Sequence, residues 1–376
     1  MLDLNYGTAA GYDAVPCVFP VHLILADTAL RSKSLTVSQM LNLWRNSIIA
    51  LGLLLVTGLA ETSSAGDADR HEKWWTYGSG ISGPDYWGIA RPIEWGMCDR
   101  GVFQSPINID PQELLFDPNL KALYIRGDIT TGYLENSGQM LMYRVDPQAE
   151  PVEISGGPLG AYKFRFVEMR FHFGDKSSHG SEHQIGGRQF PAEIQIFGFN
   201  HQLYANFSEA QTKTRGVVAA SLLVHESSDK SSQSEELRYL ASLIPQVNYR
   251  DQRVFVPKFS LTKLLPNTPQ YVTYDGSMTS PGCHETVTWI IINKPAFISR
   301  QNLNAFRDLQ RTTEKHNPPV YMYNNYRPVQ PVNVRTLRTN INFRFKNAGD
   351  QSVCRQSIQD IQYRANPKFP WEKSRN

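Results

Sequence analysis

The sequence predicts a mainly β protein with peripheral helices, of the α+β class. Its apolar segments are short, rich in Val, Ile, Phe and Tyr, and separated by Gly, Pro, Asn and Asp, which is typical of strands joined by turns. Only two stretches have a helical pattern, residues 234–243 and residues 299–309, and Ser299 is placed to cap the second. We therefore expect one sheet-based domain over residues 70–345.

The composition supports a globular core and excludes one class of partner. The chain has 376 residues, of which 41% are hydrophobic, so a large core can form. Its 38 basic and 35 acidic residues give a net charge of +3 without any long Lys or Arg run. Nucleic-acid binding needs a concentrated basic surface, and we therefore expect no nucleic-acid partner.

The amino-terminal region predicts export. An apolar run covers residues 48–60, which is too short to cross a bilayer but suits a signal peptide. We assign the signal peptide to residues 40–65, starting at Met40, with Ser63 and Ala65, or Gly58 and Ala60, as cleavage positions. Residues 1–39 form an upstream leader that we expect to be absent from the secreted, extracellular protein. The alternative is a signal anchor that is retained in the membrane.

The cysteines and one sequon also favour an extracellular protein. Beyond the leader lie Cys98, Cys283 and Cys354, and this odd number predicts one disulfide plus one thiol that is free or bonded to another chain. Asn206 begins an Asn-Phe-Ser glycosylation sequon.

Residues 346–376 form a basic tail that holds Cys354. Six basic and three acidic residues give it a charge of +3, which equals the net charge of the whole chain. This tail either contacts a partner or is a solvated terminus. It contains no apolar stretch that would indicate a lipid anchor.

Two segments carry the candidate site. Residues 167–173 alternate polar and apolar side chains, so Glu168, Arg170 and His172 lie on one face of a predicted strand. Residues 192–196 repeat this alternation.

In that second segment, Glu193 and Gln195 share a face. The stretch that joins the segments is rich in turn residues and holds His179 and His183. A spacing of four aligns side chains only on a helix, and Gly180 follows His179, so we expect a loop and exclude both histidines as metal ligands.

These segments occur among motifs that together resemble the α-class carbonic anhydrases. The resemblance implies a large, twisted, mostly antiparallel central sheet. Its motifs run in the family's order: Trp74-x-x-Tyr77, Gly83-Pro84-x-x-Trp87, Gln104-Ser105-Pro106-Ile107-Asn108-Ile109, Gly180-Ser181-Glu182-His183, Tyr274-Asp275-Gly276-Ser277-Met278-Thr279 and Val287-Thr288-Trp289.

The resemblance places the family's three zinc ligands on Arg170, His172 and Gln195. Only one imidazole is left, whereas a catalytic zinc site needs three protein ligands and an open position for water. The guanidinium of Arg170 stays protonated and opposes a cation, and the amide oxygen of Gln195 is a poor zinc ligand. We therefore expect no zinc, no other cofactor and no hydratase activity.

A buried guanidinium needs a partner. We hypothesise that Glu168 and Glu193 hold Arg170 in the former metal cavity. The alternative is that the guanidinium of Arg170 reaches water.

Other positions of the family's active site are partly retained and partly changed. By the resemblance, Thr279, Glu182 and Tyr77 belong to the network that orients the zinc-bound hydroxide, and we interpret their retention as structural, with the Thr279 hydroxyl bonded to a buried carboxylate. The proton-shuttle position is Gln139, which cannot titrate near neutral pH.

The substrate wall retains Val287 and Trp289. Phe197, however, is larger than the usual residue and is expected to fill substrate space, which Ala219 could offset.

The resemblance also implies a Cys98–Cys283 disulfide that closes nearly the whole domain. Within the family, the segment Asn325-Tyr326-Arg327-Pro328-Val329-Gln330-Pro331 resembles the acatalytic carbonic-anhydrase-related proteins of the ten/eleven type. This implies a secreted neural protein that binds a cell-surface receptor of the neurexin type, with Cys354 available for an intermolecular disulfide. The alternative is an enzyme with residual zinc-dependent carbonate dehydratase or esterase activity, in which His172 and Gln195 hold the metal.

Overall fold

The computed structural model describes residues 75–342. The predicted leader, the signal peptide and the tail with Cys354 lie outside these residues. Within them, thirteen strands form one sheet, most of whose neighbours are antiparallel, and two further short strands pair separately. The predicted fold class is confirmed.

The strands of the large sheet follow the order β11-β4-β5-β7-β9-β10-β13-β12-β15-β2, with β3, β6 and β14 attached beside this path. Parallel neighbours are β10 with β13 and β14, and β15 with β2. The strand bounds are β1 Asn108–Ile109, β2 Leu115–Phe116, β3 Leu123–Arg126, β4 Ile129–Asn136, β5 Leu141–Val145, β6 Glu153–Gly156, β7 Phe164–Phe173, β8 Gln184–Ile185, β9 Ala192–Asn200, β10 Val217–Glu226, β11 Arg253–Ser260, β12 Tyr271–Gly276, β13 Val287–Ile292, β14 Ala296–Ile298 and β15 Arg338–Thr339.

The helices within residues 75–342 are short. They are η1 Pro84–Tyr86, α2 Trp87–Ala90, α3 Met97–Arg100, η2 Pro111–Glu113, η3 Gly157–Leu159, α4 Phe207–Ala210, α5 Glu235–Leu243, η4 Ile244–Gln246, α6 Leu261–Leu264 and α7 Arg300–Arg307. Both predicted helices are confirmed as α5 and α7. Each begins after a serine whose hydroxyl accepts a backbone N–H of the first turn, Ser234 in α5 and Ser299 in α7, as expected for residues that cap helices.

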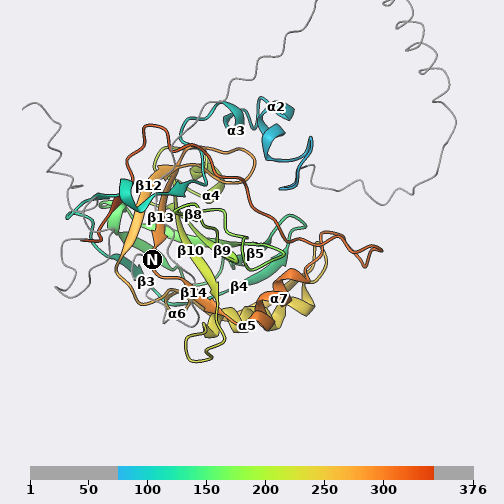
Figure 1. Cartoon of the computed structure of the whole chain (residues 1–376). Coiled ribbons are helices and arrows are strands. Elements are labelled where there is room, and N and C mark those ends of the chain that lie inside the picture. Colours follow the sequence, from blue (N-terminus) through green and yellow to red (C-terminus); the bar gives the residue numbers. More distant parts are fainter. Residues whose placement is uncertain (1–74, 343–376) are drawn as a thin grey trace, which may run out of the picture. The chain divides into compact units, whose positions relative to one another are not determined.

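The sheet buries a hydrophobic cluster on each face. Along β10, Val218 and Ala220 pack into one cluster while Val217 and Ala219 pack into the other, because alternate side chains of a strand point to opposite faces. Helices α5 and α7 lie side by side and cover the first face (Figure 1). The polar residues of the candidate site lie on the second face.

No helix among residues 75–342 has the length and apolar character needed to cross a membrane.

Candidate functional site

Strands β7 and β9 bring the two predicted segments together as antiparallel neighbours. Arg170 lies opposite Gln195, and His172 lies opposite Glu193. All four side chains are buried and point to the same face of the sheet, as the alternation predicts. Arg170, His172 and Gln195, which the resemblance assigns to the ligand positions, therefore meet at one place.

Arg170 forms a nearly buried ion pair with Glu168. Its Nε and Nη2 both donate to Glu168 Oε1, at 2.8 and 2.7 Å, and only 9% and 6% of the two side chains is exposed. Nη1 donates to the hydroxyl of Ser280 at 3.0 Å. The guanidinium also lies over the ring of Phe197, 4.6 Å from its centroid. Three polar contacts and one aromatic contact thus hold the cation in place.

The hypothesis that carboxylates hold Arg170 is confirmed for Glu168 and wrong for Glu193. Glu193 instead accepts the backbone N–H of His183 at 2.8 Å and the Ser221 hydroxyl at 2.8 Å, and its carboxylate lies 2.7 Å from His183 Nδ1. Burial alone would raise the pKa of Glu193, but the charge and hydrogen bonds of His183 lower this pKa to about 2. Glu193 is therefore an ionised part of a separate network.

Gln195 connects the buried carboxylates of Glu182 and Glu193. Its Nε2 donates to Glu182 at 2.6 Å and to Glu193 at 3.2 Å. Its Oε1 accepts the Thr279 hydroxyl at 3.3 Å. This amide oxygen, which is a poor zinc ligand, therefore already accepts a hydrogen bond from the protein.

The expected bond from the Thr279 hydroxyl to a buried carboxylate is absent among residues 75–342, because the hydroxyl bonds the amide of Gln195 instead. Glu182 accepts that amide and the backbone N–H of Arg327, at 2.8 Å. Burial lowers the pKa of the Arg327 guanidinium to about 10, and the group donates to Gln104 at 2.9 Å. Arg327 thus ties the family-like segment of residues 325–331 to the site, a role that its sequence alone did not reveal.

One ring nitrogen of His172 has no partner in the part of the chain that the structure describes. Its Nδ1 donates to the carbonyl of Asn325 at 2.6 Å, since a carbonyl can only accept. In the neutral imidazole Nε2 then carries the lone pair, and this buried atom has no hydrogen-bond partner among residues 75–342. The ring of Tyr77 lies edge-on to His172, with centroids 5.8 Å apart, and the buried Tyr77 hydroxyl likewise has no hydrogen bond to any of the described residues.

The remaining predicted residues have structural contacts. His183 uses both ring nitrogens, Nδ1 toward Glu193 and Nε2 toward Tyr274 at 2.6 Å, and the stretch around it is a loop, as expected. Gln139 is buried, and its Nε2 donates to the carbonyl of Trp75 at 3.5 Å. The structure therefore places each of these residues within the packed interior.

Phe197 is fully buried and packs against Trp289, with ring centroids 6.0 Å apart. Its cross-strand partner is Ala219, so the small residue lies beside the large one.

The predicted disulfide between Cys98 and Cys283 is confirmed, with the two residues 185 positions apart in sequence. Asn206 is exposed immediately before α4, and its side-chain oxygen accepts the N–H of Glu209 at 2.9 Å. Its glycosylation stays a prediction.

The three residues that the resemblance assigns as zinc ligands do not fit a zinc ion. A cation side chain occupies the first position, the amide oxygen of Gln195 is engaged by Thr279, and only the Nε2 of His172 offers a free lone pair. Among residues 75–342, no group of three or more His, Cys, Asp or Glu side chains is arranged to hold a metal ion. Zinc chemistry at this place would lack two of the three donors that it needs.

The large sheet, with a polar cluster on one face, is consistent with the carbonic anhydrase fold. Residues 82–341 match the model of the eukaryotic-type carbonic anhydrase family, and the chain belongs to this family.

Two relatives from Caenorhabditis elegans carry related names. Carbonic anhydrase-like protein 2 is 41% identical over 292 residues, which cover 76% of this chain and 86% of the relative. Carbonic anhydrase-like protein 1 is 32% identical over 332 residues, which cover 71% of this chain and 90% of the relative. The resemblance to carbonic-anhydrase-related proteins is thereby confirmed.

Proposed function

We propose that this protein is a secreted, non-catalytic carbonic-anhydrase-related protein that binds a cell-surface protein receptor, of the neurexin type by resemblance. The observation that carries the proposal is the ion pair of Arg170 with Glu168 at a former ligand position. A guanidinium held by three hydrogen bonds puts positive charge where a hydratase binds its metal. The protein therefore takes no zinc and no other cofactor.

Retention of the surrounding framework supports a binding role. Thr279, Glu182 and His183 are buried and hydrogen-bonded to other side chains of the domain, so they stabilise the fold without metal. The disulfide between Cys98 and Cys283 suits an oxidising compartment and supports export. A partner would therefore bind the surface of a stable domain.

Zinc content and carbon dioxide hydration of the purified, exported protein test the first half of the proposal. We expect negligible zinc and no hydration above buffer. The double variant Arg170→His with Gln195→His should gain stoichiometric zinc, because its two new imidazoles and that of His172 make a set of three. The single variant Gln195→His is the matched control and should stay without metal, since Arg170 remains. Stoichiometric zinc in the unmodified protein would refute the proposal.

The receptor half is tested by binding of the purified protein to cells that display neurexin ectodomains, with the same cells lacking them as the control. Saturable binding only to the displaying cells is expected. Its absence, with zinc also absent, would show that the receptor class is wrong while the non-catalytic assignment holds. A Cys354→Ser variant on non-reducing gels tests the intermolecular disulfide, which should disappear in that variant.

A further inference from the structure

A hollow of about 470 Å³ opens on the face of the sheet opposite the Arg170 site. Asp275 of β12 and Thr288 of β13 are cross-strand partners on its floor. Their neighbours Tyr274 and Trp289 point to the other face, into the second hydrophobic cluster. The wall includes Leu159 and other residues of the β6–β7 connection. The hollow is thus separate from the former metal position.

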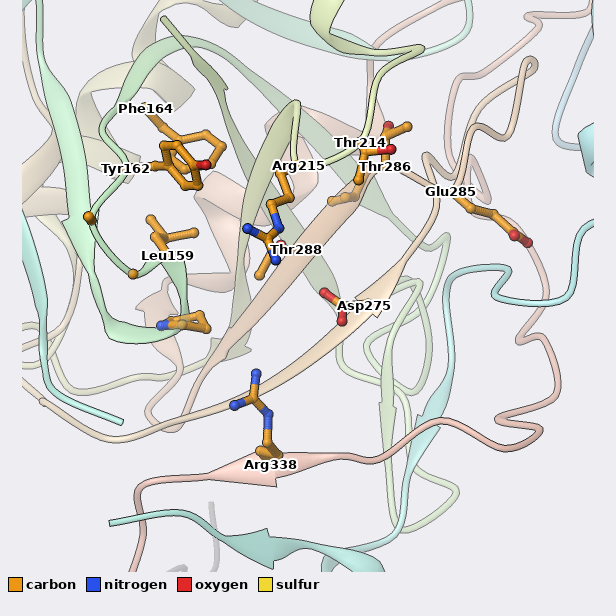
Figure 2. A pocket seen from close by; sticks show the side chains of 14 residues that line it. Leu159, Tyr162, Phe164, Thr214, Arg215, Asp275, Glu285, Thr286, Thr288 and Arg338 are labelled. Carbon is orange, nitrogen blue, oxygen red and sulfur yellow. The ribbon is translucent and has the colours of Figure 1, made fainter. Parts of the chain in front are cut away.

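Two cations reach into this hollow. Figure 2 shows the guanidinium groups of Arg215 and Arg338 pointing toward each other from opposite sides, with the carboxylate of Asp275 lying between them to one side. Among residues 75–342, the Arg215 guanidinium has no hydrogen bond or ion pair. Arg338 has one, to Asp117 at 3.2 Å, and its side chain is 35% exposed. The hollow therefore contains guanidinium N–H donors that have no acceptor among the described residues.

The backbone holds Arg215 in an unfavourable conformation. Its φ is 55°, in the left-handed region that favours glycine over a residue with a Cβ. Flanking contacts fix the loop: the Tyr204 hydroxyl donates to the carbonyl of Thr214 at 2.8 Å, and Asn200 donates to the carbonyl of Arg215 at 3.3 Å. Such strain persists where the surrounding structure imposes it, and it clusters at ligand-binding sites.

We infer that this hollow binds an acidic sugar. A carboxylate fits between Arg215 and Arg338, whose guanidinium groups can each donate two parallel hydrogen bonds to it. Asp275 and Thr288 can then bond sugar hydroxyls, and Tyr162 and Leu159 supply an apolar wall for the ring carbons. A few converging polar groups beside an apolar wall are the usual composition of a small-ligand site.

The strand pairing favours a sugar over an extended peptide. β13 lies between β10 and β12, and β12 pairs with β15 only at Val272 and Thr273. Beyond these two residues the side chain of Arg335 donates to the carbonyl of Asp275 at 3.4 Å, so the outer edge of β12 offers only a short stretch for the main-chain hydrogen bonds that an added peptide strand needs. Recognition must therefore come from side chains, which suits a ligand with many hydroxyls and one acidic group.

Calorimetric titration of the full exported chain tests the inference, with methyl glucuronide and N-acetylneuraminic acid as probes. Saturable binding of at least one is expected. The uncharged methyl glucoside should bind at least tenfold more weakly, because it lacks the carboxylate. Glucose 6-sulfate and inorganic sulfate distinguish a sugar carboxylate from any anion. Equal binding of inorganic sulfate, or no binding of either acidic sugar, would overturn the inference.

Arg215→Gly is the decisive variant, because glycine tolerates the positive φ at this position. It should weaken sugar binding at least tenfold while the thermal midpoint stays unchanged or rises. Arg338→Ala should weaken binding similarly, although the loss of its contact with Asp117 can lower stability. Arg253→Ala, at an exposed position on β11, is the matched control and should leave binding unaltered. Full binding by the stable Arg215→Gly variant would refute the site.

Discussion

Glu168→Gln should destabilise the protein strongly, because it removes the only carboxylate that pairs with Arg170 among the described residues. Glutamine keeps the shape of the side chain but removes its charge. The Arg170 side chain is only 9% exposed. Of the polar contacts of its guanidinium, only the hydrogen bond to the Ser280 hydroxyl would be unchanged. Removing one partner of a buried pair costs about 3–5 kcal/mol, so we expect the free energy of unfolding to fall by this amount.

A second substitution distinguishes a lost ion pair from a general packing defect. Methionine at position 170 has an unbranched side chain and no charge, so the double variant Glu168→Gln with Arg170→Met removes the stranded cation. Replacing a buried pair by groups of similar volume is often neutral or stabilising. The double variant should therefore recover most of the stability that the single variant loses.

Equilibrium unfolding in urea at neutral pH, without reductant, measures both effects. Arg126→Ala is the matched control, because it breaks a pair with Glu153, 3.6 Å apart, from an Arg126 side chain that is 71% exposed. Breaking it should cost less than about 1 kcal/mol. A loss of similar size for Glu168→Gln would mean that water stabilises the Arg170 guanidinium, and the reasoning would fail.

Three further predictions concern the disulfide, the buried carboxylate of Glu193 and the glycosylation sequon. Cys98→Ser should lower the free energy of unfolding by about 5 kcal/mol in the loop-entropy model, because the disulfide spans 185 positions; an unchanged urea midpoint would contradict this. The pKa of Glu193 is lowered to about 2, mainly by His183 and against the effect of burial. This shift stabilises the folded protein by about 3 kcal/mol above about pH 4.5, and the stabilisation is lost as the pH falls toward 2. In the Glu193→Gln variant, the free energy of unfolding measured with urea should therefore depend less on pH in this acid range. Ser208→Ala should remove a glycan mass, because it destroys the sequon but retains the helix cap of Asn206; an unchanged mass would disprove glycosylation.

The sequence predicted the faces of the strands but not the register between them. Alternation within residues 167–173 is a local property, and it placed Glu168, Arg170 and His172 on one face correctly. Whether Glu193 or Gln195 lies opposite Arg170 depends on the register of β7 with β9, which no local pattern states. The incorrect pairing of Arg170 with Glu193 came from this gap.

Loop contacts account for the other differences. His183 lies in the loop between β8 and the preceding strand β7, and its N–H and ring nitrogen reach Glu193. Ser280, which bonds Arg170, follows the motif that ends at Thr279 and had no predicted role. Spacing along the chain does not reveal such contacts, because loops bring together residues that are distant in sequence.

Gln195 also determines what restoration of a metal site would require. Its amide nitrogen satisfies Glu182 and Glu193 together, and its oxygen accepts the Thr279 hydroxyl. An imidazole that binds metal through one nitrogen has a single N–H left, so histidine at this position can serve only one of the two carboxylates. Thr279 would lose its acceptor in the same substitution and could donate to the other. We therefore expect Arg170→His with Gln195→His to bind zinc fully only while Thr279 is intact, and a Thr279→Ala triple variant with undiminished zinc affinity would disprove this coupling.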